Sequence, residues 1–194
     1  MFTPFIGVAS WFAFFVAIEH LGEIELAATN VIRSISTLFF VIVNSLAATT
    51  GSLVSNLLGA RQKHLVIPLC NRIIRLGYAI GFPLIVLCII FSNYIFYIYS
   101  GNGNLIQMAR LPFIVALLNY AFALPGYVYM NAVTGTGATR ITFIFQTVTI
   151  VAYQIYLWSI SYFSTSLSVY WTAEYLYVIL LGLLAVIYLK NKNY

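Results

Sequence analysis

The sequence predicts an all-α membrane protein, built as a six-transmembrane-helix bundle. Three observations carry this prediction: 62% of the 194 residues are hydrophobic, only 7% are charged, and six apolar runs are long enough for a bilayer. Soluble domains carry about 25% charged residues, so this chain has too few charges to cover its surface in water. Disordered, collagenous, coiled-coil and disulfide-rich classes are excluded as well, because they need high charge, a glycine repeat, heptads or many cysteines.

Each predicted span is an apolar run of about 20 residues or more, the length that a helix needs to cross the hydrocarbon core. Short segments of turn-forming residues separate these runs. The alternating pattern of a membrane β-strand is absent from the sequence. The spans are predicted at residues 3–20, 27–57, 76–99, 109–134, 140–163 and 169–189, and together they form one domain over residues 1–194.

The first two runs differ in character. Residues 3–20 lack a preceding basic segment, so we expect a true span and no cleaved signal peptide. Residues 27–57 are predicted to form a helix of roughly 46 Å. Small residues dominate its stretch 44–52. Close helix packing explains this composition, and a polar groove facing a central cavity would use the same residues.

The next two runs contain helix breakers. Gly81 and Pro83 lie in the third run, and Pro112 and Pro125 lie in the fourth. Each proline removes a backbone hydrogen bond and bends a helix, so these are the expected sites of bending. Such bends either permit motion, or neighbouring helices satisfy the backbone groups that the prolines leave free.

The loops predict the orientation. If the chain starts inside, the inner loops carry most of the basic residues, as the positive-inside rule requires. Aromatic residues flank the loop at 164–166 between the last two runs, as expected of an outer interfacial belt. We therefore expect both termini in the cytoplasm, and the net charge of +5 reports orientation and not a nucleic-acid partner. The inner cations are Arg61, Lys63, Arg72, Arg75, Arg140, Lys190 and Lys192, and the outer one is Arg110.

Apart from Arg110 and Arg140, which lie at the ends of their spans and are counted with the loops, three charged residues lie within the predicted spans, where each costs about 2.5 to 3.5 kcal/mol at the bilayer centre. They are Glu19, Arg33 and Glu174, all at a similar depth in the outer half. Either they form ion pairs or snorkel to the headgroups, or they bind a substrate cation or a proton. We expect Arg33 to lie within hydrogen-bonding reach of one of these acids, with Glu19 favoured because a short turn joins their helices.

Neutral polar and aromatic residues in the spans are further candidates. The amides can line a cleft and bind a substrate, although ordinary interhelical hydrogen bonds explain them equally well. Aromatic rings on the fourth run can offer cation–π surfaces to a lipophilic cation, or can simply belong to the core. The amides are Asn44, Asn119, Asn131, Gln146 and Gln154, and the rings are Tyr120, Phe122, Tyr127 and Tyr129.

The sequence does not predict an enzyme. An intramembrane serine protease needs a nucleophile with a histidine in reach, but His20 and His64 fall on opposite sides of the predicted bundle. Ser52 lacks the flanking glycines of a nucleophile elbow. Metal-binding and phosphate-loop motifs are also absent from the sequence.

Four motifs, in this order and spacing, carry a family resemblance. They are WFAFFVAIEHLG at 11–22, LAATN at 26–30, LLGA at 57–60 and GTGATR at 135–140. With these motifs the chain resembles the second half of multidrug and toxic compound extrusion (MATE) transporters, and it looks most like their bacterial sodium-driven branch. The resemblance covers essentially the whole chain.

The resemblance implies a fold of two six-helix bundles around a central cleft, of which this chain would be one half. It implies export of amphipathic or cationic compounds in exchange for Na⁺ or H⁺, in the inner membrane of a bacterium. Binding in such repeat transporters lies between the halves, so the chain should be inactive without an N-terminal half or a second copy. A lipid or polysaccharide flippase of the same superfamily, or a structural membrane subunit, is the alternative.

The chain departs from the family at its ion-binding positions. The resemblance implies buried carboxylates in the middle of the first and fourth spans, but residues 7–10 and 120–124 contain none, and the chain has no aspartate. The family role therefore cannot be transferred to Glu19 merely because it shares the first span.

Overall fold

The computed structural model describes residues 12–99, 103–163, 166–192 and 194. In this part of the chain, the structure is helical throughout, which confirms the predicted all-α fold class. Five of its helical segments are long and apolar enough to cross a membrane. Residues 12–19 are also helical, and the remainder of the predicted span 3–20 lies outside the described residues.

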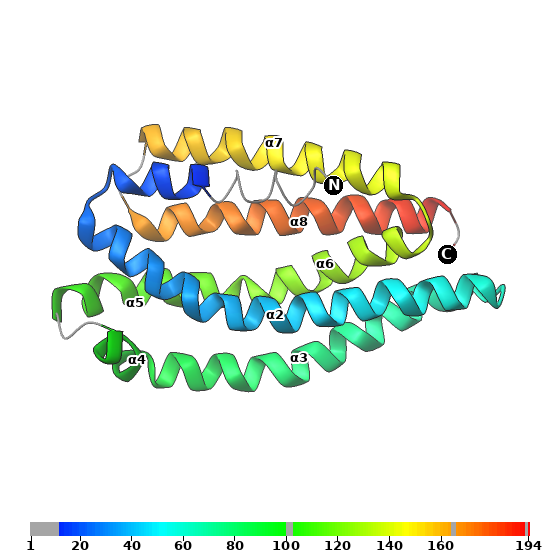
Figure 1. The fold of residues 1–194 in the computed structure, drawn as a ribbon, viewed down its shortest axis with the longest axis horizontal. Coiled ribbons are helices and arrows are strands. Elements are labelled where there is room, and N and C mark those ends of the chain that lie inside the picture. Colours follow the sequence, from blue (N-terminus) through cyan, green and yellow to red (C-terminus); the bar gives the residue numbers. More distant parts are fainter. Residues whose placement is uncertain (1–11, 100–102, 164–165, 193) are drawn as a thin grey trace.

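The helices lie roughly side by side in an elongated bundle (Figure 1). α6 is the central helix and packs most extensively against α2 and α8. α7 covers α8 on one side, and α3 covers α2 and α6 on the other. The bounds are Glu23–Gly59 for α2, Val66–Ile90 for α3, Ser92–Tyr99 for α4, Gly103–Leu118 for α5, Tyr120–Gly135 for α6, Thr139–Phe163 for α7 and Leu167–Asn191 for α8.

α2 is longer than predicted because its first turn is polar. The helix has 37 residues, which corresponds to roughly 55 Å. It begins after Gly22, whose φ of 139° suits glycine. Glu23 and Glu25 lie in its first turn, where the helix dipole favours negative charge. A search for apolar runs misses such a turn, and the predicted start at residue 27 was therefore too late.

α3 corrects the prediction of a loop over residues 59–75. The loop ends much earlier, with a short 3₁₀ helix at Lys63–Leu65, and α3 begins at Val66. Cys70 and Ile74 are buried on one face of its first turns, while Arg72 and Arg75 are exposed. The arginines lower the hydropathy of the segment but leave its helical period intact.

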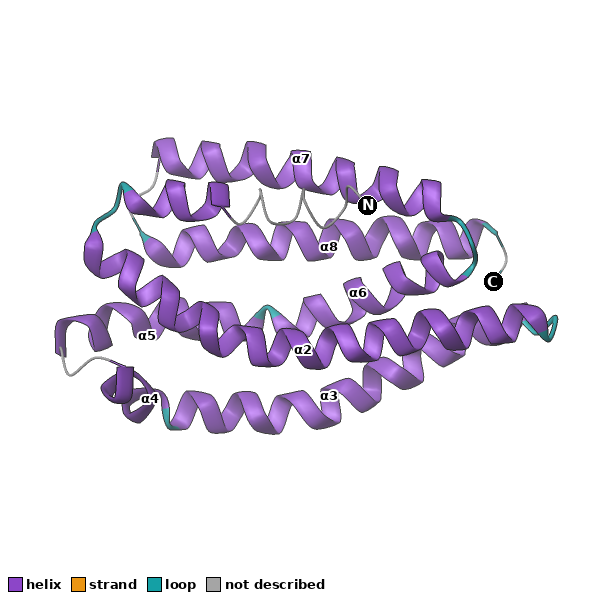
Figure 2. Ribbon diagram, in the orientation of Figure 1, coloured by secondary structure: helices purple, strands orange, loops and turns teal. Residues whose placement is uncertain are grey.

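The predicted span 109–134 matches one segment of membrane-crossing length, Gln107–Gly135, but this segment is divided between two helices. α5 ends at Leu118 and α6 begins at Tyr120, with Asn119 between them. Figure 2 shows this interruption as a short loop in the middle of the bundle. Pro112 and Pro125 lie within the two helices on either side of the interruption. A second one-residue interruption, at Phe91, divides the predicted span 76–99 between α3 and α4.

Glycines let α6 approach its neighbours closely. A Cβ on Gly126 would lie 2.6 Å from the Val178 carbonyl oxygen of α8. A Cβ on Gly135 would collide with the Gly51 backbone of α2, and the Ser55 hydroxyl donates to the Gly135 carbonyl at 2.9 Å. Part of the small-residue stretch at 44–52 therefore serves close packing, as in other membrane helix pairs.

The described loops alternate between the two ends of the bundle (Figure 1). The α2–α3 and α6–α7 connections and the C-terminus share one end. At that end, the Lys63 ammonium group lies 5.9 Å from the centre of the Tyr194 ring. The loops that carry Arg61, Lys63 and Lys192 thus lie on one side of the molecule, as the loop analysis predicts.

Candidate functional site

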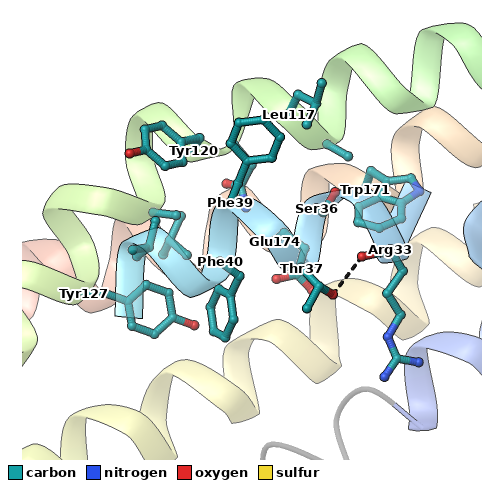
Figure 3. A pocket seen from close by; sticks show the side chains of 15 residues that line it. Arg33, Ser36, Thr37, Phe39, Phe40, Leu117, Tyr120, Tyr127, Trp171 and Glu174 are labelled. Atoms are coloured by element: carbon teal, nitrogen blue, oxygen red, sulfur yellow. Dashed lines mark hydrogen bonds between the residues drawn. The ribbon is translucent and has the colours of Figure 1, made fainter. Parts of the chain in front are cut away.

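A cavity of about 280 Å³ opens between α2, α8 and the α5–α6 interruption. It brings together three of the predicted site residues, Arg33, Asn119 and Glu174. Figure 3 shows the Glu174 carboxyl group and the side chains of Ser36, Thr37 and Phe40 facing this space. The lining is completed by Phe39, Val43, Ala116, Leu117, Tyr120, Ala123, Tyr127, Trp171 and Val178.

Glu174 is the acid of this cavity. It lies on α8, about two turns into the helix, and it is partly buried. The Tyr153 hydroxyl of α7 donates to its Oε1 atom at 3.2 Å. Tyr153 is only 3% exposed, so the donor is held in place by its packing. The arrangement leaves the other carboxyl oxygen available to a ligand, because no further hydrogen bond to Glu174 joins it to a described residue.

Aromatic rings form much of the wall. Phe40 and Tyr127 meet edge to face, with centroids 5.4 Å apart, and Phe39 meets Tyr120 at 6.0 Å. Tyr120 and Tyr127 were predicted as cation–π candidates, and the structure places both beside the acid. Ring faces attract cations electrostatically. A positively charged, partly apolar molecule therefore complements this wall and Glu174 together.

The predicted ion pair of Arg33 stays a prediction. In Figure 3 the guanidinium group of Arg33 points away from Glu174. Its Cζ atom lies 5.0 Å from the centre of the Phe15 ring. Arg33 is exposed at the edge of the cavity. The prediction used similar depth and a short connecting turn, but it took no account of the aromatic ring that the helix at 12–19 offers.

The other predicted site residues lie elsewhere. Glu19 is exposed near the end of the helix at 12–19, and Asn44 is exposed on α2. Gln146 is partly buried on α7. None of them lines the cavity. Asn131, a further amide, donates to the Tyr127 carbonyl at 3.0 Å within α6 and has a structural explanation.

Sequence reasoning missed two lining residues, Ser36 and Trp171, and the hydrogen-bond donor to Glu174, Tyr153. Trp171 was interpreted only as part of an interfacial belt, but it is 3% exposed and packs edge-on against Phe14 at 5.4 Å. The one available signal was spacing: Trp171 and Glu174 are three residues apart, so they share a helix face.

α2 also presents a polar stripe beside the cavity. The stripe consists of exposed polar residues that lie mostly three, four or seven positions apart along the helix, so they share one face. Arg33 and Thr37 belong both to the stripe and to the cavity lining. The members are Asn30, Arg33, Ser34, Thr37, Asn44, Ser45, Thr49, Ser52, Ser55 and Asn56.

The comparisons with known proteins agree with this architecture. The family model described as MatE matches residues 1–159 of the chain. No curated protein and no solved structure matches the chain. The family match covers most of the sequence, and the structure adds several helices of membrane-spanning length and composition. The chain is therefore a member of the MatE family of multi-pass membrane transporters.

Proposed function

We propose that this chain forms the C-terminal half of a multidrug efflux transporter, which exports lipophilic or cationic compounds in exchange for a cation. The observation that carries the proposal is Glu174, a partly buried acid that shares a cavity with several aromatic rings. A carboxylate inside a membrane is costly and is usually functional. Here it stands in for the mid-span acids that the family resemblance implies and that residues 7–10 and 120–124 lack.

The polar stripe on α2 supports a second bundle as the partner. Several of its hydroxyls bond to their own helix, as Thr37 does to the Arg33 carbonyl at 2.8 Å. The amide groups of Asn30 and Asn44 are costly to expose to hydrocarbon. An N-terminal half, or a second copy of this chain, would cover the stripe and leave a polar cleft beside the cavity. The chain alone would then be inactive.

Cation exchange follows if Glu174 binds substrate and coupling ion in turn. Glu174, Asn119 and Ser36 all belong to the lining of one cavity. Oxygen ligands suit a hard cation such as Na⁺, and the carboxylate alone suits a proton. Alternate occupation would couple uptake of either ion to release of a cationic substrate.

The basic end of the bundle supports a cytoplasmic position for the C-terminus and for the α2–α3 connection. The positive-inside rule applies to short loops, and Arg61, Lys63 and Lys192 gather at this end. We assign the protein to the bacterial inner membrane on the basis of its resemblance to the bacterial branch of the family.

An efflux assay tests the proposal. Cells without their own drug pumps are loaded with a fluorescent lipophilic cation and express this chain with an N-terminal six-helix half. We expect export with both halves, none with this chain alone, and a loss of at least tenfold for Glu174→Gln. Glu19→Gln is the matched control and should retain export. Full export by Glu174→Gln would refute the role of the acid, and imposed Na⁺ and pH gradients identify the coupling ion.

A further inference from the structure

The first turns of α3 carry a pair of arginines at the edge of a long apolar surface. Arg72 and Arg75 are both exposed and lie three residues apart, so they share a face of the helix. Leu76 follows at once and is 54% exposed. From there, large apolar side chains continue along the exposed surface of α3 as far as Ile90. The step from Arg75 to Leu76 therefore matches the level at which phospholipid headgroups meet their acyl chains.

Asn71 adds a third polar group to the same turn. The Tyr129 hydroxyl of α6 donates to Asn71 Oδ1 at 2.7 Å, and the Asn71 side chain is exposed. Its amide oxygen is thus occupied, whereas no described residue accepts a hydrogen bond from its amide N–H groups. Asn71 lies four residues before Arg75, so the two side chains are neighbours on the helix surface. This turn of α3 therefore offers several hydrogen-bond donors to a ligand.

No carboxylate of the described residues lies near these arginines. The four acidic residues of the chain are all glutamates. Glu19, Glu23 and Glu25 lie at or just before the start of α2, which runs for 37 residues, or roughly 55 Å, before its connection to α3. Glu174 is separated from Asn191, the last residue of α8, by roughly 25 Å of helix. The arginine pair is therefore left without an internal counter-charge.

Other cations strengthen the positive potential at this end of the bundle. Of the nine lysines and arginines in the chain, only Arg33 and Arg110 lie away from it (Figure 1). Basic residues near a membrane surface attract anionic lipids, and guanidinium groups bind phosphate through two parallel hydrogen bonds. A zwitterionic headgroup would place its own ammonium group among these cations, with no carboxylate to receive it. An anionic headgroup fits this end better.

We infer that the first turns of α3 form a binding site for the headgroup of an anionic phospholipid, such as phosphatidylglycerol. Arg72 and Arg75 would hold the phosphate, Asn71 would donate to the headgroup, and an acyl chain would lie along Leu76 and Ile80, which is 44% exposed. An acidic segment of a partner protein would also neutralise the arginines, but it would leave the apolar surface beside them uncovered. A phospholipid covers both.

Fluorescence quenching by brominated lipids tests the inference where the acyl chain would lie. Leu76→Trp places a reporter beside the arginines in the full chain, with Trp11 and Trp158 replaced by Phe. Trp171 is kept, since it is only 3% exposed, and its emission is subtracted. The chain is reconstituted in phosphatidylcholine vesicles that contain an increasing share of brominated phosphatidylglycerol or brominated phosphatidylcholine. We expect phosphatidylglycerol to bind beside the reporter about tenfold more tightly.

Substitution of the arginines gives the second arm of the test. In the Leu76→Trp chain, Arg72→Gln combined with Arg75→Gln should reduce the preference to about twofold or less. Arg110→Gln is the matched control, because it removes an exposed arginine of α5, at the opposite end of the bundle (Figure 1). It should leave the preference unchanged. Equal binding of the two lipids, or a preference that survives the loss of both arginines, would overturn the inference.

A second reporter position separates a defined site from general attraction. Ile98→Trp places the reporter on α4, at the other end of the bundle, where Ile98 is 81% exposed. The preference for phosphatidylglycerol should stay below about twofold there. A tenfold preference at both positions would mean that anionic lipid gathers all around the chain, and would overturn a defined site.

Soluble glycerol phosphate distinguishes a lipid from a free phosphate compound. A millimolar excess of it outside and inside the vesicles should leave the quenching at position 76 unchanged, because it has no acyl chain to cover the apolar surface. Release of the brominated phosphatidylglycerol by glycerol phosphate would assign this turn of α3 to a soluble ligand and would contradict the inference.

Discussion

Two polar clusters lie on opposite sides of the start of α6, and they differ in whether their hydrogen bonds are complete. Between α3 and α6, the Tyr78 hydroxyl donates to the Ala121 carbonyl at 2.5 Å, and the Tyr120 hydroxyl donates to the Gly77 carbonyl at 2.8 Å. We call this reciprocal pair the tyrosine clasp. On the side of α2 and α8, the cavity leaves three buried polar atoms without partners.

The tyrosine clasp has a clear structural purpose. Pro125 has no N–H and therefore frees the carbonyl four residues earlier, at Ala121. Tyr78 satisfies this carbonyl from the neighbouring helix. Gly81 makes room for the Tyr120 ring, since a Cβ at this position would collide with it. The bend in α6 is thus compensated on the α3 side.

The tyrosine clasp and the cavity show that polar groups in a membrane interior differ in how they affect stability. Satisfied groups stabilise the bundle, because every donor has found its acceptor. Unsatisfied groups lower stability, and the three residues that bear them here line the cavity of Glu174. Tyr120 contributes to both clusters: its ring lines the cavity, and its hydroxyl belongs to the clasp and points away from Phe39 and Leu117 in Figure 3.

The largest expected effect comes from Gly126, because both clusters depend on the position of α6. Gly126→Ala places a methyl group 2.6 Å from the Val178 carbonyl oxygen, and two backbones cannot easily relax. We expect a loss of about 3 kcal/mol in the free energy of unfolding in detergent. Gly59→Ala is the matched control, since a Cβ at Gly59 meets nothing within 4 Å. Equal stability of the two variants would show that the α6–α8 contact is looser than described.

Breaking the tyrosine clasp should have the next largest effect. Tyr78→Phe removes one hydroxyl and leaves the Ala121 carbonyl unsatisfied, so we expect a loss of about 2 kcal/mol in unfolding free energy. Tyr94→Phe, on an exposed side chain of α4, should cost far less. Ligand affinity should remain within about twofold of the parent, because Tyr78 does not line the cavity. A strong loss of affinity with little loss of stability would mean that Tyr78 serves ligand binding and does not stabilise the bundle.

A smaller effect is expected at the α7–α8 contact, where two tyrosines make similar bonds to different partners. Tyr153 donates to Glu174 Oε1 at 3.2 Å, and the Tyr156 hydroxyl lies 3.0 Å from the Thr172 hydroxyl. Each substitution by Phe should cost about 1 kcal/mol of stability. Only Tyr153→Phe should also weaken binding of a cationic ligand, because the Glu174 carboxylate then loses the hydroxyl that holds it in position. Identical affinities in the two variants would exclude a positioning role for Tyr153.

The sequence was sufficient to predict most of the fold, because long apolar runs in a membrane have few alternatives to helices. It was insufficient at the start of α3, where Arg72 and Arg75 interrupt the hydropathy but not the helical period. The interruption at Asn119 had only an indirect signal, namely the prolines in the same apolar run. Helix boundaries in such segments depend on tertiary hydrogen bonds that no single helix contains.

The candidate site was predicted only in part. Charge within a span identified Glu174 and Arg33, and amide chemistry identified Asn119. The same reasoning also selected Glu19, Asn44 and Gln146, which lie outside the cavity. Ser36 and Trp171 were missed as site residues because the absence of a hydrogen-bond partner depends on what surrounds an atom in space. The prediction for Arg33 likewise took no account of the Phe15 ring, whose centre lies 5.0 Å from the Arg33 Cζ atom.

The most direct test of the central claim is the unfolding midpoint with and without ligand, measured for two matched hydroxyl deletions and for Glu174→Gln. Ser36→Ala removes an unpartnered hydroxyl of the cavity, and Tyr78→Phe removes a partnered hydroxyl of the clasp. Without ligand, we expect Ser36→Ala to unfold at the parent midpoint or slightly above it, and Tyr78→Phe to unfold clearly below it. With a saturating lipophilic cation, Tyr78→Phe should keep the parent's rise, whereas Glu174→Gln, which removes the acid of the cavity, should lose most of it. The opposite pattern, with stability lost in Ser36→Ala and the ligand-induced rise lost in Tyr78→Phe, would contradict the account.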